Sequence, residues 1–392
     1  MNKYILNTDI QYFINKNIAT DSLSVLLSNP IFDGASSKEI INQIIAAKKC
    51  ENKLPTWFHT PYIYYPLPLQ IEQTSSEITA QYKASLLSGK TGADISGGFG
   101  VDSFYFAKNT DTVFHVEINT ELSEIVGYNF KVLGVKNINC ILSDSLNFLE
   151  KQTALDWVYI DPSRRDQKKG KVFLLEDCSP NIKDILPLLW SKTQTILIKT
   201  APILDIKAGL KDLSHVKEVQ AIGVGNEVKE LLWILEKDYQ GPAALTAVLL
   251  ESSLDSTKFT TSIDIEANSM APKSEVLAYL YEPHAAVMKI GAFKSVAQQM
   301  GLFKLHDHSH LYTATSLVPF PGRSFKVKAV LPYNKKNLKI FTKTKANVSV
   351  RNFKSTVADL RKKHSLQDGG HVYMFFSTDL NNKAVVIVCE KI

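Results

Sequence analysis

The sequence predicts an α/β protein in which a largely parallel sheet with crossover helices lies between an N-terminal helical region and a C-terminal α+β part. Short apolar runs alternate with helical stretches from residue 92 to residue 236, which is typical of parallel strands joined by helices. A glycine-rich turn follows the first run. The chain has 392 residues, 45% hydrophobic and 21% charged, enough for roughly two or three domains with proper cores.

Residues 1–79 are predicted to form the helical region, because apolar residues recur there at helical spacing. In the segment 54–69, prolines alternate with aromatic residues, which favours an extended, irregular path. We expect these aromatic side chains to pack on the next domain or to form a wall of a substrate cleft. The segment 74–77 fits a capping box that opens a helix through about Leu87.

Seven apolar runs are the predicted strands, near residues 92–96, 112–117, 137–142, 155–160, 194–199, 216–224 and 229–236. A hairpin-like turn at 225–227 joins the last two. Extended runs at 243–250 and 260–265 lead to a polar linker near 267–274, and a helix is expected over 285–300. Ligands of open α/β sheets bind beyond the carboxyl ends of the strands, so the residues after each run are the candidate site.

The turn after the first run is the centre of the predicted site. Its sequence is Asp94-Ile-Ser-Gly-Gly-Phe-Gly-Val-Asp102. Gly97, Gly98 and Gly100 can adopt positive φ and carry no Cβ, so backbone N–H groups can approach a ligand closely. A dinucleotide-binding turn needs G-x-G-x-x-G/A, which this segment lacks, because its only register ends in Ser103. The pattern D-x-x-G-G-x-G-x-D instead predicts a turn that cradles a cationic or hydroxylated cofactor.

Acidic residues also follow the second and third runs. Glu117 is suited to accept hydrogen bonds from two ribose hydroxyls, and Asp144 could accept one from an adenine amino group, with Ser145 capping the next helix. Either acid alone could be a helix N-cap. Together with Asp94 they favour one shared ligand site at the edge of the sheet.

From about residue 80 to 237 the chain resembles class I S-adenosylmethionine (SAM) methyltransferases, whose seven-stranded Rossmann-like sheet ends in such a hairpin, with the final strand inserted antiparallel. The resemblance implies a methyltransferase domain over 80–270 with SAM as cofactor. It assigns cofactor binding to Asp94, Ser96, Gly97, Gly98, Gly100, Asp102, Glu117, Ile118, Asp144 and Ser145. Gln73, Ser75 and Ser76 are further candidates for the methionine end of the cofactor.

Asp161-Pro162-Ser163, after the fourth run, resembles the D-P-P-aromatic signature of amino-methylating enzymes. The resemblance implies that these residues are catalytic and orient a target nitrogen. Ser163 replaces the second proline of the signature and Arg164 its aromatic residue, so base stacking is not carried over.

Three basic residues near the fourth and fifth strand ends are the candidate substrate-binding residues. Arg164 and Arg165 could stack on a base or bind phosphate, and Lys199 borders the mouth of the cleft. The alternatives are surface ion pairs of the arginines with nearby acids and a Lys199 side chain that only extends to solvent.

The C-terminal third resembles a small ferredoxin-like module over 271–321 followed by a THUMP-like domain over 322–392. These occur joined to methyltransferase domains in a bacterial family of predicted methyltransferases. The motifs that carry the resemblance are Tyr281-Glu-Pro-His-Ala-Ala286, Phe320-Pro-Gly-Arg323 and the segment 346–371. THUMP domains in general bind RNA, so the resemblance implies a nucleic-acid partner.

The charge distribution also indicates a nucleic-acid partner. Residues 322–392 contain fifteen Lys or Arg and four acids, a net charge of +11, whereas the whole chain carries +6. This asymmetry indicates a polyanion partner for the C-terminal end, with a solvated lysine-rich surface as the alternative.

These observations favour a SAM-dependent methyltransferase acting on structured RNA. A SAM-dependent methyltransferase of a protein or small molecule, and a non-catalytic RNA-binding protein with this fold, are the alternatives. No run reaches the roughly 18 apolar residues that span a bilayer, so we expect a cytoplasmic protein without a membrane partner. His306, His308 and His310 are expected on one face of a strand, where their side chains span too far to converge on one ion. With four dispersed cysteines, this predicts no obligate metal.

Overall fold

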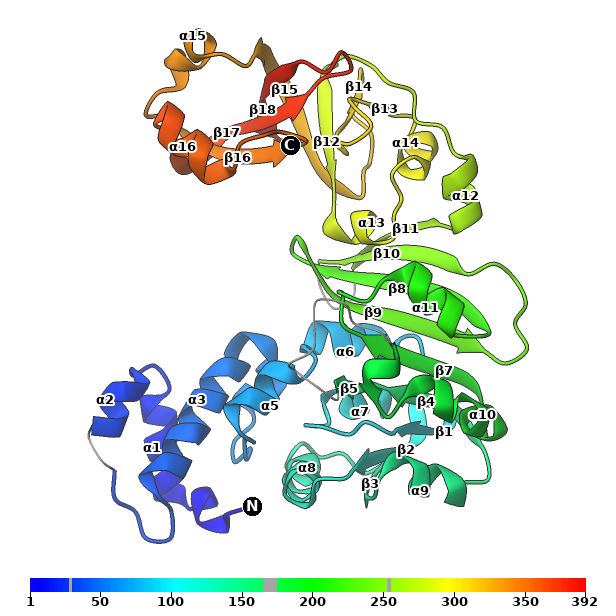
Figure 1. Ribbon diagram of the computed structural model, residues 1–392. Helices are drawn as coiled ribbons and strands as arrows, with labels where there is room; N and C mark the ends of the chain where they lie inside the picture. Colours follow the sequence, from blue (N-terminus) through cyan, green and yellow to red (C-terminus); the bar gives the residue numbers. More distant parts are fainter. Residues whose placement is uncertain (28–29, 165–174, 252–254) are drawn as a thin grey trace. The chain divides into compact units, whose positions relative to one another are not determined.

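The computed structural model describes residues 1–27, 30–164, 175–251 and 255–392. The chain forms two compact units (Figure 1). The first consists chiefly of Met1–Lys217 with Leu231–Gly241, and the second of Glu218–Glu230, Pro242–Glu251 and Ser256–Ile392.

The N-terminal region is helical, as predicted. Its elements are η1 (Lys3–Leu6), α1 (Thr8–Asn17), α2 (Ser22–Leu27), α3 (Ser37–Lys53), α4 (Pro55–His59), α5 (Pro68–Gln73) and α6 (Glu77–Ala84). The expected irregular path over 54–69 is only partly right, because Pro55 and Pro68 each begin a short helix, a position where proline loses no hydrogen bond. The predicted capping box is also shifted, since Ser76 caps α6.

The aromatic residues of this region pack on the neighbouring domain, the first of the two expectations. Trp57 is fully buried, and its ring lies 4.9 Å from that of Phe104 and 6.2 Å from that of Phe99. Burial of large aromatic side chains fixes the helical region against the sheet domain.

The large sheet contains β1 (Gly89–Asp94), β2 (Thr110–Glu117), β3 (Ile138–Leu142), β4 (Leu155–Ile160), β7 (Thr193–Thr200), β8 (Val216–Val224), β9 (Glu227–Glu236), β10 (Ala244–Leu250) and β11 (Ser256–Thr261). Their order is β11-β10-β8-β9-β7-β4-β1-β2-β3. The connecting helices include α7 (Val101–Phe106), α8 (Thr120–Val132), α9 (Ser145–Lys151), α10 (Ile182–Lys192) and α11 (Ile206–Asp212). Short paired strands β5 (Ser163–Arg164) and β6 (Cys178–Ser179) follow β4.

The predicted sheet is confirmed and extended. β1, β2, β3, β4 and β7 pair in parallel, and β9 is inserted antiparallel to β7. β10 and β11 continue the sheet to nine strands in the described part of the chain. The run 260–265 was wrongly predicted to be extended, because Ser262 ends β11 by capping α12 (Ile263–Asn268), its Oγ accepting from the N–H of Ile265.

Burial explains why the central strands lie where they do. Trp157, Val158, Tyr159 and Ile160 of β4 are at most 1% exposed, as expected for a parallel strand covered on both faces. The carboxyl ends of parallel strands meet at one edge of the sheet, so β1, β2, β4 and β7 bring the residues that follow them to the same place.

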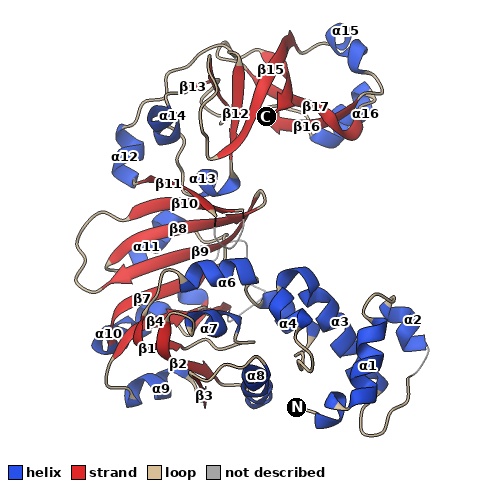
Figure 2. Cartoon of the chain, turned by 180° about the vertical axis from the view of Figure 1, so that it is seen from behind, coloured by secondary structure: helices blue, strands red, loops and turns tan. Residues whose placement is uncertain are grey.

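The C-terminal part forms one seven-stranded sheet of order β13-β14-β12-β15-β18-β17-β16 (Figure 2). The strands are β12 (Tyr279–Pro283), β13 (Phe303–Lys304), β14 (Tyr312–Ala314), β15 (Gly322–Pro332), β16 (Lys345–Arg351), β17 (Gln367–Thr378) and β18 (Ala384–Lys391). The helices are α13 (Ala285–Lys289), α14 (Ser295–Met300), α15 (Lys335–Leu338), η3 (Lys339–Phe341) and α16 (Val357–His364). The two predicted modules therefore share a sheet.

Two local expectations in this part are wrong. The helix predicted over 285–300 is split into α13 and α14, and Gly291, with φ +75°, lies between them. His306, His308 and His310 lie in the turn between β13 and β14 rather than along a strand. His306 is held there by hydrogen bonds to Asn382 and Asn352.

Candidate functional site

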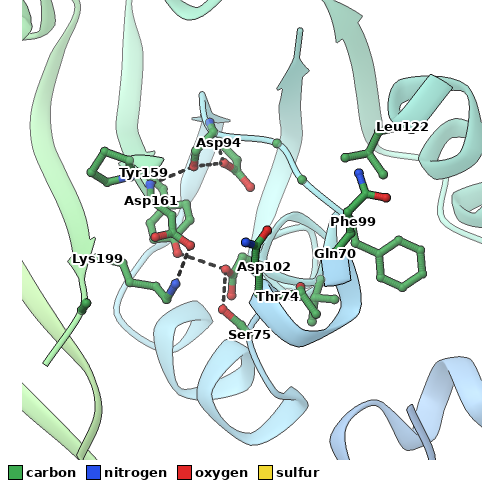
Figure 3. Close-up of a pocket in the computed structure, with 17 residues that line it drawn as sticks. Gln70, Thr74, Ser75, Asp94, Phe99, Asp102, Leu122, Tyr159, Asp161 and Lys199 are labelled. Atoms are coloured by element: carbon green, nitrogen blue, oxygen red, sulfur yellow. Dashed lines mark hydrogen bonds and ion pairs between the residues drawn. The ribbon is translucent and has the colours of Figure 1, made fainter. Parts of the chain in front are cut away.

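A pocket of about 750 Å³ opens at the carboxyl ends of β1, β4 and β7 (Figure 3). It is lined by Gln70, Gln73, Thr74, Ser75, Asp94, Ser96, Gly97, Gly98, Phe99, Val101, Asp102, Leu122, Tyr159, Asp161, Pro162, Lys199 and Ala201. Eight of the predicted site residues are among them: Asp94, Ser96, Gly97, Gly98, Asp102, Asp161, Pro162 and Lys199. Gln73 and Ser75, the further candidates, line it too.

The glycine turn forms one wall of the pocket. Gly97, Gly98 and Gly100 have φ of +46°, +69° and +78°. A Cβ on Gly97 would come within 2.5 Å of the Val116 carbonyl oxygen, whereas a Cβ on Gly98 would meet nothing within 4 Å. Gly97 is therefore required by the protein's own packing, and Gly98 leaves open space on the pocket side.

Glu117, at the end of β2, holds this turn in place. One carboxylate oxygen, Oε2, accepts from the Gly98 N–H at 2.8 Å, and the other, Oε1, accepts from the Asn119 N–H at 2.7 Å. The side chain is therefore next to the glycine turn although it is not among the lining residues.

Asp94 is the most buried carboxylate of the pocket, at 1% exposure. It accepts hydrogen bonds from the Ser96 N–H and hydroxyl, at 3.0 and 2.9 Å, and from the Ser103 hydroxyl at 2.8 Å. Burial, together with the negative charge of Asp102, raises the pKa of Asp94 to about 7. This carboxyl group therefore changes charge near neutral pH.

A second buried network lies beneath the pocket. Lys83, on α6, is fully buried and its Nζ is 3.1 Å from Asp102 Oδ1 and 2.7 Å from the Ser75 hydroxyl. Ser75 and the Tyr159 hydroxyl donate to Asp102 Oδ2 at 2.8 and 3.0 Å. Asp102 is thus fixed from three sides, and its charge is balanced by Lys83.

We expect Lys83→Met to lower the free energy of unfolding by about 3–5 kcal/mol, because it leaves the Asp102 carboxylate buried without its cation. Urea denaturation followed by circular dichroism measures this. The double variant Lys83→Met with Asp102→Asn removes both charges and should recover much of the loss. A single variant as stable as the parent would contradict the buried ion pair.

Asp161 and Lys199 lie side by side in the lining of the pocket, with their charged groups toward one another (Figure 3). Lys199 Nζ donates to Asp161 Oδ2, with the lysine side chain 15% exposed and the aspartate side chain 33% exposed. The Asp161 N–H donates to the Ser96 hydroxyl at 2.8 Å. Because Ser96 also donates to Asp94, one hydroxyl connects the glycine turn to the Asp161 loop.

The remaining predicted residues are not brought into the pocket lining. Ile118 is 72% exposed. Asp144 is partly exposed and caps α9 by accepting from the Asn147 N–H at 3.0 Å, which lowers the pKa of its carboxyl group. Ser145 is the first residue of α9. For Asp144 and Ser145 the cofactor assignment stays a prediction.

The substrate-binding role of Arg164 and Arg165 also stays a prediction. Ser163 and Arg164 form the short strand β5, and Arg165 lies outside the described residues. Gly100 does not line the pocket, and a Cβ there would come within 2.7 Å of the Phe130 ring, so this glycine serves the packing of the turn on α8.

Lys83, Tyr159 and Gln70 were missed from the sequence. Lys83 looks like any helix lysine, and only the packing of α6 on α7 brings it to Asp102. Tyr159 reads as an ordinary apolar strand residue. No local signal could have identified Lys83 or Tyr159, because each is defined by its contact with Asp102, which is distant in sequence.

Within the described ranges, no group of three or more His, Cys, Asp or Glu side chains could hold a metal ion. In the same part of the chain no helix is long and apolar enough to cross a membrane.

Two family models match the C-terminal part: a ferredoxin-like domain over residues 279–321 and a THUMP domain-like family over residues 322–391. No curated protein matches the chain. The crystal structure of a putative methyltransferase from Porphyromonas gingivalis W83 is 28% identical, with a TM-score of 0.89 over 98% of this chain and 97% of that one. The predicted fold class and C-terminal domains are thus confirmed.

Two smaller structures match part of the chain. TrmK from M. capricolum, in complex with S-adenosyl-homocysteine, is 21% identical with a TM-score of 0.32, over 41% of this chain and 68% of that one. An rRNA methylase from Streptococcus thermophilus is 15% identical with a TM-score of 0.30, over 42% and 95%. Both scores are below 0.5, so the fold assignment rests on the Porphyromonas structure.

Proposed function

Because the chain shares its fold with a putative methyltransferase and ends in ferredoxin-like and THUMP-like domains, we propose that it is a SAM-dependent methyltransferase of RNA. The observation that carries the proposal is the pocket at the glycine turn. There an open glycine, the buried carboxylates of Asp94 and Asp102, and the Asp161–Lys199 pair surround one cavity. When bound, SAM would supply an activated methyl group.

The residues of the pocket suit a cationic nucleoside. Gly98 leaves room for close approach, ionised Asp94 can attract positive charge, and the Thr74 and Gln70 side chains add polar groups. Isothermal titration with SAM tests cofactor binding. The absence of detectable binding at millimolar SAM would remove the methyltransferase proposal and leave an RNA-binding protein.

We expect SAM affinity to rise about tenfold from pH 6 to pH 8. The pKa of Asp94 is about 7, so this carboxyl group is mostly neutral at pH 6 and mostly ionised at pH 8, and only the ionised form attracts a cationic ligand. Titration calorimetry across this range measures the change. Asp94→Asn should bind SAM more weakly and with a flat profile, whereas an equally steep profile in that variant would assign the ionisation to another group.

The RNA part of the proposal rests on the THUMP-like domain. Six of its lysines are exposed on α15, η3, the segment after η3 and the last turn of α16: Lys335, Lys336, Lys339, Lys343, Lys362 and Lys363. These segments are neighbours, because the Lys343 N–H donates to the Ser365 carbonyl at 2.9 Å. Their charges form a basic surface of the kind that binds phosphates.

Charge reversal should weaken RNA binding and its salt dependence. For Lys336→Glu, Lys339→Glu and Lys343→Glu combined, we expect the slope of log K against log salt to fall by about 2, roughly 0.7 for each lost phosphate contact. Fluorescence anisotropy with bulk transfer RNA from 50 to 200 mM salt, a range of about fourfold, measures it. Reversing the exposed Lys16, Lys48 and Lys211 instead is the matched control. Equal effects of both triples would refute a specific basic surface.

A further inference from the structure

The structure places a cation and a carboxylate side by side in the lining of the pocket. Lys199 Nζ and Asp161 Oδ2 are hydrogen-bonded, both residues line the pocket, and neither side chain is more than one-third exposed. A base that enters the pocket therefore meets a hydrogen-bond acceptor and a charged donor together.

Resting on the proposed function, we propose that the target is the ring nitrogen of a lactam base, guanine or uracil, rather than an exocyclic amino group. A lactam has an N–H donor next to a carbonyl acceptor. Its N–H would face the Asp161 carboxylate and its carbonyl oxygen would face the Lys199 ammonium.

The reaction of a lactam uses both groups. The ring N–H proton passes to the Asp161 carboxylate, and the nitrogen electron pair forms the new N–CH₃ bond. The C–S bond of the sulfonium donor breaks, which leaves a neutral thioether and a neutral methylated base. Negative charge that develops on the carbonyl oxygen is stabilised by Lys199.

Charge balance favours this assignment. Before proton transfer the pocket holds the ion pair of Asp161 and Lys199, and after it Lys199 faces the anionic carbonyl oxygen. One ion pair is exchanged for another in a partly buried site, so no uncompensated charge appears.

An exocyclic amino group would gain nothing from the same lysine. Its electron pair is delocalised into the ring, and a cation beside the neighbouring ring nitrogen draws electron density further from the amino nitrogen. The Asp161-Pro162-Ser163 segment resembles the amino-methylating signature, but the ion pair with Lys199 changes the chemistry that this segment can support.

The test identifies the methylated atom. Total RNA from a strain that lacks the protein is incubated with the full chain and SAM carrying a CD₃ group, then digested to nucleosides for mass spectrometry. CD₃ on the guanine or uracil ring nitrogen is the expected result. CD₃ on any other atom overturns the lactam assignment but keeps the RNA methyltransferase. No CD₃ in RNA despite SAM binding overturns both.

Two Lys199 variants test the role of the cation. Lys199→Met should slow transfer by about 100- to 1,000-fold, and its rate should rise about tenfold per pH unit above pH 7, because the lactam must then lose its proton without the cation. Lys199→Arg keeps a cationic donor and should retain most of the activity. Unchanged SAM affinity shows that the pocket is intact. Equal rates for Lys199→Met and the parent would overturn the proposal.

Discussion

Asp161→Asn is expected to slow methyl transfer by about 100- to 10,000-fold and to leave SAM affinity almost unchanged. The asparagine keeps the size of the side chain and the backbone N–H that donates to the Ser96 hydroxyl, so the glycine turn is undisturbed. What it loses is the carboxylate that holds Lys199 and can take up a proton from the target base.

Single-turnover transfer of CD₃ to RNA and titration calorimetry with SAM separate these effects. Asp111→Asn is the control, because Asp111 is an exposed acid at the start of β2, at the opposite end of the strand from the pocket. An asparagine variant with nearly full activity would show that orientation by an amide is sufficient, and Asp161 would then not act as the base.

Gly98→Ala is expected to weaken SAM binding by about 10- to 100-fold. Gly98 lines the pocket, and a Cβ there would point into space that no protein atom occupies within 4 Å. The added methyl group would therefore collide with a bound cofactor rather than with the protein. Overpacking of this kind costs about 1–3 kcal/mol, which corresponds to a loss of SAM affinity of about 10- to 100-fold.

Gly134→Ala is the matched control for backbone strain. Gly134 has φ +74°, close to the +69° of Gly98, and a Cβ there also meets nothing within 4 Å. Both variants should lose a similar free energy of unfolding, about 1 kcal/mol, in thermal or urea denaturation. Only Gly98→Ala should lose cofactor affinity. Equal SAM binding by both variants would place the cofactor away from the glycine turn.

The alternation of apolar runs and helices was sufficient to predict the parallel sheet, and apolar residues at helical spacing predicted the helical N-terminal region. The inserted antiparallel strand was implied by the resemblance to class I methyltransferases. Parallel strands buried on both faces must be nearly continuous apolar runs, so their signal is local. The boundaries were less well predicted where a single residue decides them, as Ser262 does at the end of β11 and Gly291 does between α13 and α14.

Part of the candidate site could also be predicted, because a fold of this class brings strand ends to one edge. Asp94, Gly97, Gly98 and Asp161 lie at or after the ends of buried strands, and the structure brings them to one pocket. Asp144 also follows a strand, but it caps its helix and does not line the pocket. The order of strands alone cannot tell a carboxylate that faces a pocket from one that caps a helix.

The sequence by itself determined which residues end each strand, where glycine is needed and how strongly the C-terminal end is charged, because these properties depend on neighbours along the chain. Only the tertiary structure decided that Lys83 neutralises Asp102, that Ser96 connects Asp94 to Asp161, and that Lys199 faces Asp161. Each of these interactions joins side chains distant in sequence, and their electrostatic energies depend on the distance and burial that packing creates.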